Sequence, residues 1–314
     1  MKKRIIRIAA LVIAVITFAV STVGLVSAIS TADAKEPIDT SRSCSLTLTY
    51  SYNETYYEGL EIEIYRIAEV TEDLQYSLTD DFEDYSVEIN KISSSSEWDE
   101  VCSTIGMYVD TGKVERTNVL LTDENGKVSF RDLKPGIYYV NWTNNPTKDN
   151  TIGFLPFLIA VPGIGEDGKW IYDVDAIPKP GYNPYIYYDK YTVVKQWRDI
   201  GLKEKRPVNV SVQIYRDGEL FDEVILSEEN NWTYTWATHA PYKWNVIEKN
   251  LPSEYKVIIV EENGVFYVTN SIEDPAPQTG DTNDFSVWIV LMAISGLVLV
   301  ILGTTGRRKY AEND

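Results

Sequence analysis

Tyr191-Thr192-Val193-Val194-Lys195-Gln196-Trp197 is the stretch from which the fold can be argued. Successive side chains of a β-strand point to opposite faces, so Val193, Lys195 and Trp197 share one face. Short segments of the same kind, separated by turn residues, recur through residues 185–273. Together they predict an immunoglobulin-like β-sandwich, with strands at 191–197, 208–215, 221–226, 232–236, 244–248, 255–260 and 265–270.

Three polar residues interrupt otherwise apolar strand faces in this region. Lys195 follows Val193, Glu248 follows Trp244 and Val246, and Asn270 follows Phe266 and Val268. If these faces point inward, the three polar side chains meet in the core, where a lone ammonium or carboxylate is costly to bury. The pattern alone allows a plain buried Lys–Glu pair with Asn as its hydrogen-bond partner, or exposure of these faces.

The motifs around these residues resemble the collagen-adhesin B-type (CnaB) family. They are Lys195-Gln196-Trp197, the aromatic run 230–236, 244–248 and Val268-Thr269-Asn270. The resemblance implies an internal isopeptide bond between Lys195 and Asn270, promoted by Glu248. An apolar site lowers the pKa of a lysine and raises that of a carboxylic acid, which suits a neutral nucleophilic amine beside a proton-shuttling acid. Fixed geometry then replaces an external catalyst.

Residues 35–181 predict a second, N-terminal β-sandwich, so the fold class is all-β with two such domains in tandem. Strands are expected at 45–50, 60–65, 154–161 and 170–179, with a hairpin turn at Asn125-Gly126, and residues 98–105 are helix-like. Prolines between 178 and 184 predict a short stiff linker. No lysine occurs on the first strand near 45–50, so we expect no isopeptide bond in this domain.

The last predicted strand of the first domain ends in a lysine. Trp170-Ile171-Tyr172-Asp173-Val174-Asp175-Ala176-Ile177-Pro178-Lys179 resembles the pilin motif of sortase-assembled pili, with Ala176 and Ile177 departing from the usual Val and Tyr. The resemblance implies that Lys179 supplies the amine that attacks the next subunit. The plain alternative is an edge strand that ends in a solvated lysine.

Both ends of the chain resemble targeting segments. Residues 1–34 have a basic start, an apolar core and an Ala-x-Ala site, as in a signal peptide. Residues 275–314 resemble a sortase sorting signal, with the motif at 276–280, an apolar run at 285–302 long enough to span a membrane, and a basic tail at 307–309. The resemblance implies that sortase cuts between Thr279 and Gly280. Ala276 replaces the usual Leu, and the plain alternative is a simple C-terminal membrane anchor.

Composition narrows the classes of function. A net charge of −18 argues against nucleic acid as a partner, and 22 Tyr with 8 Trp suits a β-rich core. The two cysteines, Cys44 and Cys102, either form one disulfide or lie as two buried thiols. We expect no metal site, no cofactor and no turnover enzyme. The single histidine, His239, stands in a Thr-His-Ala-Pro loop.

The sequence as a whole predicts an exported structural pilin subunit of a Gram-positive surface pilus. Sortase would join Thr279 of one copy to Lys179 of the next. The expected partners are therefore sortase, other pilin subunits and, at the base of the fibre, peptidoglycan. The alternative is a cell-wall-anchored adhesin, or an accessory or basal pilin, that is attached once and binds a host or matrix ligand.

Overall fold

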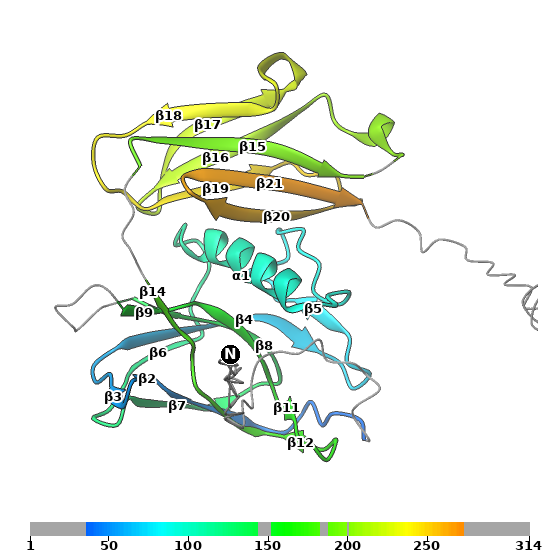
Figure 1. Cartoon of the computed structure of the whole chain (residues 1–314). Coiled ribbons are helices and arrows are strands. Elements are labelled where there is room, and N and C mark those ends of the chain that lie inside the picture. Colours follow the sequence, from blue (N-terminus) through cyan, green and yellow to red (C-terminus); the bar gives the residue numbers. More distant parts are fainter. Residues whose placement is uncertain (1–35, 144–151, 183–187, 200, 273–314) are drawn as a thin grey trace, which may run out of the picture. The chain divides into compact units, whose positions relative to one another are not determined.

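The computed structural model describes residues 36–143, 152–182, 188–199 and 201–272 (Figure 1). Over these residues the structure is mostly β, as predicted, with several sheets and one α-helix. The signal-peptide region, Thr279, Gly280 and the predicted membrane span lie outside the described residues. Among those that the structure does describe, no helix is long and apolar enough to cross a membrane.

The first sandwich is built from two main sheets, of strand order β13-β1-β7 and β10-β8-β4-β5, with β6 also paired to β4. Strand β1 lies parallel to β13, so Leu46 is opposite Val174. The elements of this region are β1 (Cys44–Thr49), β2 (Ser51–Tyr52), β3 (Thr55–Tyr56), β4 (Glu61–Val70), β5 (Tyr76–Leu78), α1 (Ser95–Val109), β6 (Asn118–Leu121), β7 (Lys127–Leu133), β8 (Gly136–Trp142), β9 (Ile152–Phe154), β10 (Phe157–Val161), β11 (Gly163–Ile164), β12 (Trp170–Ile171), β13 (Asp173–Ala176) and β14 (Pro180–Tyr182).

Three of the predicted features of this sandwich are wrong in detail. The run 154–161 divides at Leu155 and Pro156 into β9, which pairs with β14, and β10, which pairs with β8. The run 170–179 does not form one strand, because the buried Tyr172 interrupts it. Its first part, β12, pairs with β11, and only β13 joins the main sheet. The Asn125-Gly126 turn does not close a hairpin of paired strands. It carries the chain from β6, which pairs with β4, to β7, which pairs with β1 in the other sheet.

Helix α1 includes and extends the stretch predicted to be helical. Ser94 caps its N-terminus, and the Glu97 side chain binds back to the backbone of the cap in a capping box. The side chains of Trp98, Val101 and Ile105 follow at helical spacing and are buried. The helix therefore presents an apolar stripe to the core cluster that it shares with the second sandwich.

The second sandwich contains all seven predicted strands, each within about two residues of its expected ends. Two sheets face each other, with strand orders β18-β15-β21-β20 and β17-β16-β19. Asp217-Gly218 has positive φ at both residues and closes the β16–β17 hairpin, as a two-residue turn requires. The elements are β15 (Lys190–Arg198), η1 (Lys203–Lys205), β16 (Asn209–Arg216), β17 (Glu219–Ser227), η2 (Glu228–Asn230), β18 (Thr233–Ala237), β19 (Trp244–Lys249), β20 (Tyr255–Glu262) and β21 (Val265–Ile272).

Of the two alternatives for the cysteines, the structure contains buried thiols. Cys44 starts β1 and lies in the apolar cluster between the sheets of the first sandwich. Cys102 lies on α1, in the other cluster. A disulfide would have to join two separate cores, and the possible Cys44–Cys102 bridge is not formed. Burial raises the pKa of Cys44 to about 11 and that of Cys102 to about 12, which keeps both sulfurs protonated.

Candidate functional site

Three strands carry the polar side chains that the sequence singles out. Burial along β15 alternates, so Val193 and Lys195 both point into the sandwich. The parallel neighbour β21 places Asn270 opposite Trp197, two residues from the Lys195 position. Glu248 comes from β19 in the facing sheet. The site therefore lies between the sheets, with lysine and asparagine on one side and glutamate on the other.

The three side chains meet around the Glu248 carboxyl group. Asn270 Nδ2 donates a hydrogen bond of 2.8 Å to Glu248 Oε1, and Lys195 Nζ lies 3.6 Å from Glu248 Oε2. The side chains of Lys195 and Glu248 are 0% and 1% exposed, and Asn270 is fully buried. The amine and the carboxamide thus each contact one oxygen of the same acid, shielded from water.

Burial sets the protonation of this pair. It lowers the pKa of Lys195 to about 8, although the nearby Glu248 carboxylate acts in the opposite direction. It also raises the pKa of Glu248, against the effects of Lys195 and of the hydrogen bond from Asn270. Both shifts reduce the cost of a neutral amine beside a protonated acid. The site is therefore biased toward the protonation state in which the lysine is a nucleophile.

Backbone carbonyls hold the lysine amine. Nζ donates to the carbonyl oxygens of Gln196 at 2.9 Å and Val268 at 3.1 Å, and it lies 4.2 Å from the centre of the Trp197 ring. A neutral amine has two N–H bonds, and these two carbonyls use both. The nitrogen lone pair then remains available for bond formation.

Two polar atoms of the site have no hydrogen-bond partner within the described part of the chain: Asn270 Oδ1 and Glu248 Oε2. Buried polar atoms are normally satisfied, and exceptions often mark a site of chemistry. A half-turn of the Asn270 carboxamide about its Cβ–Cγ bond exchanges its nitrogen and oxygen. A protonated Glu248 can then donate to Oδ1 and polarise the carbonyl carbon.

Sequence analysis missed an ionic network beside this site. The Asp199 carboxylate accepts hydrogen bonds from Arg206 Nε, at 2.8 Å to Oδ2, and from the Tyr255 hydroxyl at 3.1 Å. Asp199 follows β15 directly, and Arg206 lies 5.4 Å from the Trp197 ring that also covers Lys195. Asp199 comes just after the strand in sequence and belongs to no recognisable motif. Its partners could therefore be identified only from the folded structure.

The first sandwich has the same arrangement of its first and last strands, but apolar side chains occupy it. In β1 and its parallel neighbour β13, Leu46 pairs with Val174 and Leu48 with Ala176, and all four are buried. No amine and carboxamide meet there. We therefore keep the expectation that the first sandwich forms no isopeptide bond between its first and last strands.

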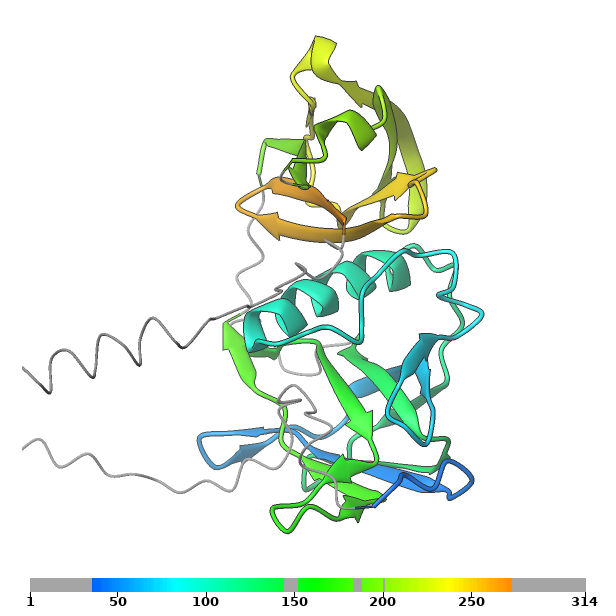
Figure 2. The same ribbon diagram turned by 90° about the vertical axis from the view of Figure 1, so that its right-hand side faces the viewer.

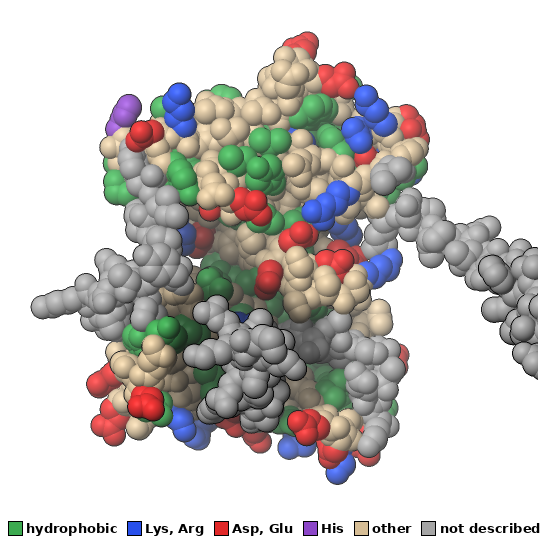
Figure 3. Space-filling model, in the orientation of Figure 1, with side chains coloured by type: hydrophobic (Ala, Val, Ile, Leu, Met, Phe, Trp, Pro, Cys, Tyr) green, Lys and Arg blue, Asp and Glu red, His purple; other side chains and the backbone are tan. Residues whose placement is uncertain are grey.

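Lys179 lies apart from the buried site. It is exposed and lies between β13 and β14, and its backbone carbonyl accepts a hydrogen bond from the Leu155 amide. Within the described ranges no acidic side chain forms an ion pair with it. His239 is exposed in its loop. Figure 3 shows acidic side chains scattered over the face in view, with fewer basic ones between them.

A family model described as "Cna protein B-type domain" matches residues 191–271, the region that contains the buried site. We refer to residues 191–271 as the CnaB-type domain, after the family model that they match. The collagen adhesin of Staphylococcus aureus is 32% identical over 106 residues, which cover 31% of this chain. That match spans only 9% of the adhesin's own length.

Three solved structures of surface proteins align with this chain at low sequence identity. A single B repeat unit of the S. aureus collagen-binding surface protein is 18% identical and covers 74% of this chain and 99% of its own, with a TM-score of 0.25. The major pilin of Corynebacterium diphtheriae is 12% identical, with 76% and 99% covered and a TM-score of 0.28. The shaft pilin of Lactobacillus rhamnosus GG is 11% identical, with 75% and 100% covered and a TM-score of 0.26. At these identities and TM-scores, the three matches carry no argument about this chain.

Proposed function

We propose that this chain is an exported structural subunit of a Gram-positive cell surface, and that its CnaB-type domain crosslinks itself through Lys195 and Asn270. The observation that carries the proposal is the buried contact of both side chains with Glu248. A plain buried ion pair does not require an asparagine whose carbonyl oxygen is unsatisfied. The bond formed is internal, so the chain modifies itself once and turns over no substrate.

The proposed reaction replaces the side-chain amide of asparagine by a secondary amide. The neutral Nζ of Lys195 attacks Cγ of Asn270, while protonated Glu248 donates to the carbonyl oxygen and stabilises its developing charge. Glu248 then accepts a proton from the attacking nitrogen and delivers one to Nδ2. As the Cγ–Nδ2 bond breaks and ammonia leaves, the oxygen returns its proton to Glu248 and the carbonyl group re-forms. One C–N bond thus forms, one breaks and Glu248 is regenerated.

The position of this bond suits a chain under tension. It ties the first strand of the domain, β15, to the last, β21. A force that enters at the start of β15 and leaves at the end of β21 passes through the covalent bond. It therefore bypasses the roughly 75 residues between Lys195 and Asn270, and the sandwich stays folded.

The same load path favours a polymer. Lys179 precedes β15 and Thr279 follows β21, so subunits joined from Thr279 to Lys179 would apply force across the CnaB-type domain. The exposure of Lys179 supports its role as the acceptor amine. In this proposal sortase cuts between Thr279 and Gly280, copies of the chain form a pilus shaft, and the last copy is transferred to peptidoglycan.

Surface extracts from an expressing Gram-positive host test the polymer. We expect a ladder of high-mass species from the natural sequence and from Lys190→Ala, a control at another exposed lysine. Lys179→Ala should remove the ladder but leave wall-anchored monomer, and Thr279→Ala should abolish both. A ladder that survives Lys179→Ala would contradict the assigned acceptor.

The match to a collagen adhesin favours a second candidate, a wall-anchored adhesin that is attached once. This candidate needs Thr279 but not Lys179. Wall-anchored protein without any ladder from the natural sequence would support it. It would leave the internal crosslink untouched, since that bond stiffens an adhesin stalk equally well.

A further inference from the structure

Strand β19, which carries Glu248, is buried on both of its faces. Its inward face holds Trp244, Val246 and Glu248, and its outward face holds Asn245 and Ile247, each only 3% exposed. β19 is an edge strand of its sheet, a position whose outer face is normally wet. Another element of the chain must therefore cover it.

Helix α1 from the N-terminal part of the chain supplies this cover. Asn245 Nδ2 donates to Asp110 Oδ2, at the C-terminal end of α1, at 3.1 Å, and lies 3.4 Å from Met107 Sδ. Asp110 also pairs with Lys243 at 2.6 Å, just before the strand. The last turn of α1 thus rests directly on the outward face of β19.

The middle of the same helix seals the other sheet. β20 is the edge strand there, and its Ile259 amide donates to Thr104 Oγ1 of α1 at 2.8 Å. The Ile259 carbonyl and the Glu100 carbonyl both lie within reach of the same hydroxyl. Both ribbon views show α1 running beside the sheet edge that β20 forms (Figures 1 and 2).

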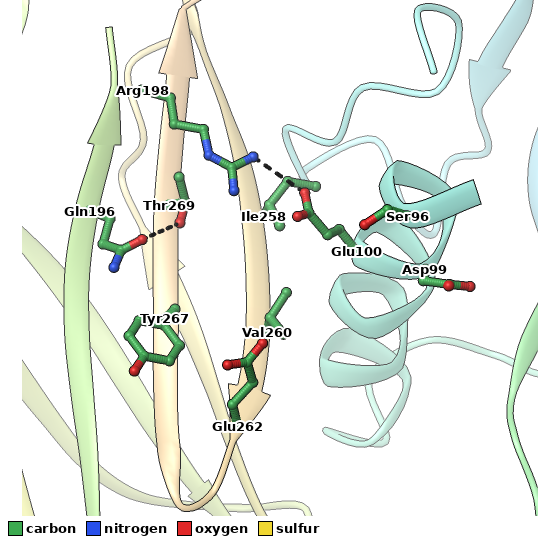
Figure 4. A pocket seen from close by; sticks show the side chains of 10 residues that line it. All are labelled: Ser96, Asp99, Glu100, Gln196, Arg198, Ile258, Val260, Glu262, Tyr267 and Thr269. Carbon is green, nitrogen blue, oxygen red and sulfur yellow. Dashed lines mark hydrogen bonds and ion pairs between the residues drawn. The ribbon is translucent and has the colours of Figure 1, made fainter. Parts of the chain in front are cut away.

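The N-terminal turns of α1 stand away from the sheet. A groove of about 430 Å³ separates Ser96, Asp99 and Glu100 of the helix from the outer face of β15, β21 and β20 (Figure 4). The Arg198–Glu100 ion pair, at 3.3 Å, crosses it. Close packing therefore starts at Thr104 and continues to Asp110, across the side of the sandwich where β19 and β20 leave the two sheets open.

Tyr108 lies in this closely packed part of the helix. It is 1% exposed and its ring stacks on Tyr85 at 3.7 Å. Burial raises the pKa of Tyr108, and the charge of Glu248 raises it further, as expected for a phenol near that carboxyl group. Tyr108 and Met107 of α1 lie in the same buried cluster as Val246 and Ile247 of β19, the strand that carries Glu248.

We infer that α1 completes the crosslinking site of the CnaB-type domain by shielding Glu248 from water through Tyr108 and Met107. The inference rests on the proposed crosslink. These residues act as positioning residues: they touch no reacting atom, but their bulk maintains the desolvation that favours the neutral lysine and the protonated acid. Bond formation then requires that α1 has docked, so the domain is locked only once the N-terminal sandwich has folded against it.

The rate of ammonia loss in the chain 36–279, followed by intact mass after cell-free synthesis, tests this dependence. In Tyr108→Ala, water regains access to Glu248. If the pKa of Glu248 returns by about one unit toward its ordinary value, the population of neutral Lys195 beside protonated Glu248 falls roughly tenfold. We expect bond formation to slow by that factor. Tyr108→Phe, which keeps the ring, and Asp99→Ala, on the groove side of α1, should react at the natural rate.

A milder variant and a second readout guard against misfolding. Asp110→Ala removes the two contacts that dock the end of α1 and should also slow the reaction. In an Asn270→Ala background, which cannot form the bond, NMR titration of Lys195 should show its pKa rising toward the ordinary value when Tyr108→Ala is added. An unchanged pKa and an unchanged rate would overturn the inference. A natural chain that loses no ammonia would refute the crosslink instead, and the titration would still decide whether α1 shields the site.

Discussion

Lys195→Met removes the proposed crosslink while keeping an unbranched apolar side chain in the core. The Lys195–Asn270 bond closes a loop of about 75 residues. The chain-entropy relation for such a loop gives a stabilisation of ~4.5 kcal/mol at 25 °C, because the crosslink restricts the unfolded chain. Methionine has a similar volume to the lysine side chain, so the packing of the core should change little. The loss of the loop constraint should therefore dominate the change in the free energy of unfolding.

We expect Lys195→Met to lower the melting temperature of the CnaB-type domain by roughly 20–35 °C, at the 4–8 °C per kcal/mol typical of a domain of this size. Calorimetry and urea unfolding on residues 36–279 measure this directly. Lys190→Met is the matched control, because Lys190 lies on the same strand but is exposed. A Lys195→Met chain that melts within a few degrees of the natural one would refute the reasoning.

Three further predictions follow from the same structure. The rate of bond formation should be bell-shaped in pH, because the reactive pair, a neutral Lys195 beside a protonated Glu248, holds one proton. In acid both groups are protonated and the amine cannot attack; above the pKa of Lys195, about 8, the pair loses its last proton and the acid cannot donate. A rate still rising above pH 9 would contradict the assignment. Cys44 and Cys102 should react slowly with a thiol reagent in the native protein and both react after denaturation without reductant, whereas no reactive thiol in denaturant would indicate a disulfide. Gly126→Ala should destabilise the first sandwich by about 2 kcal/mol or more, because φ is +67° and a Cβ would lie 2.3 Å from the Tyr50 carbonyl oxygen. The control Gly112→Ala, with φ +68° and open space around the Cβ, should cost about 1 kcal/mol. Equal melting temperatures of the two variants would argue against the clash.

The strands of the second sandwich could be predicted from local sequence. Its strands alternate cleanly, and Asp217-Gly218 can adopt the positive φ values of a tight hairpin. The alternation of side chains between the two faces of a strand also predicted that Lys195, Glu248 and Asn270 meet in the core. This alternation depends only on the local backbone, so it can be read from the sequence. Residues whose neighbours in sequence decide their environment were predictable.

The failures arose where partners lie far along the chain. Asn125-Gly126 has the local chemistry of a hairpin turn, but β7 pairs with β1 rather than with β6. Tyr172 bends the run that was expected to be one strand, and its hydroxyl accepts a hydrogen bond from the Asp39 amide at 2.8 Å. Local propensity contains no information about either contact.

The cover provided by α1 could not be predicted for the same reason. Residues 98–105 predicted a helix with an apolar stripe, but no pattern states which surface that stripe meets. In the sequence, the cover is indicated locally by Ile247, an apolar side chain on the strand face that a sandwich normally exposes to water. Asn245 lies on the same face, and both are buried. Their burial becomes intelligible once α1 is placed against β19.

The intact mass of recombinant residues 36–279, with peptide mapping, tests the central claim most directly. We expect the mass of the natural chain to fall short of its sequence by one ammonia, and a peptide that joins Lys195 to Asn270 to be recovered. Glu248→Gln, which keeps the size of the side chain but removes the acid, should show the full mass of its own sequence and no joined peptide. A natural chain at full sequence mass would contradict the claim and leave Lys195, Glu248 and Asn270 as an ordinary buried polar cluster.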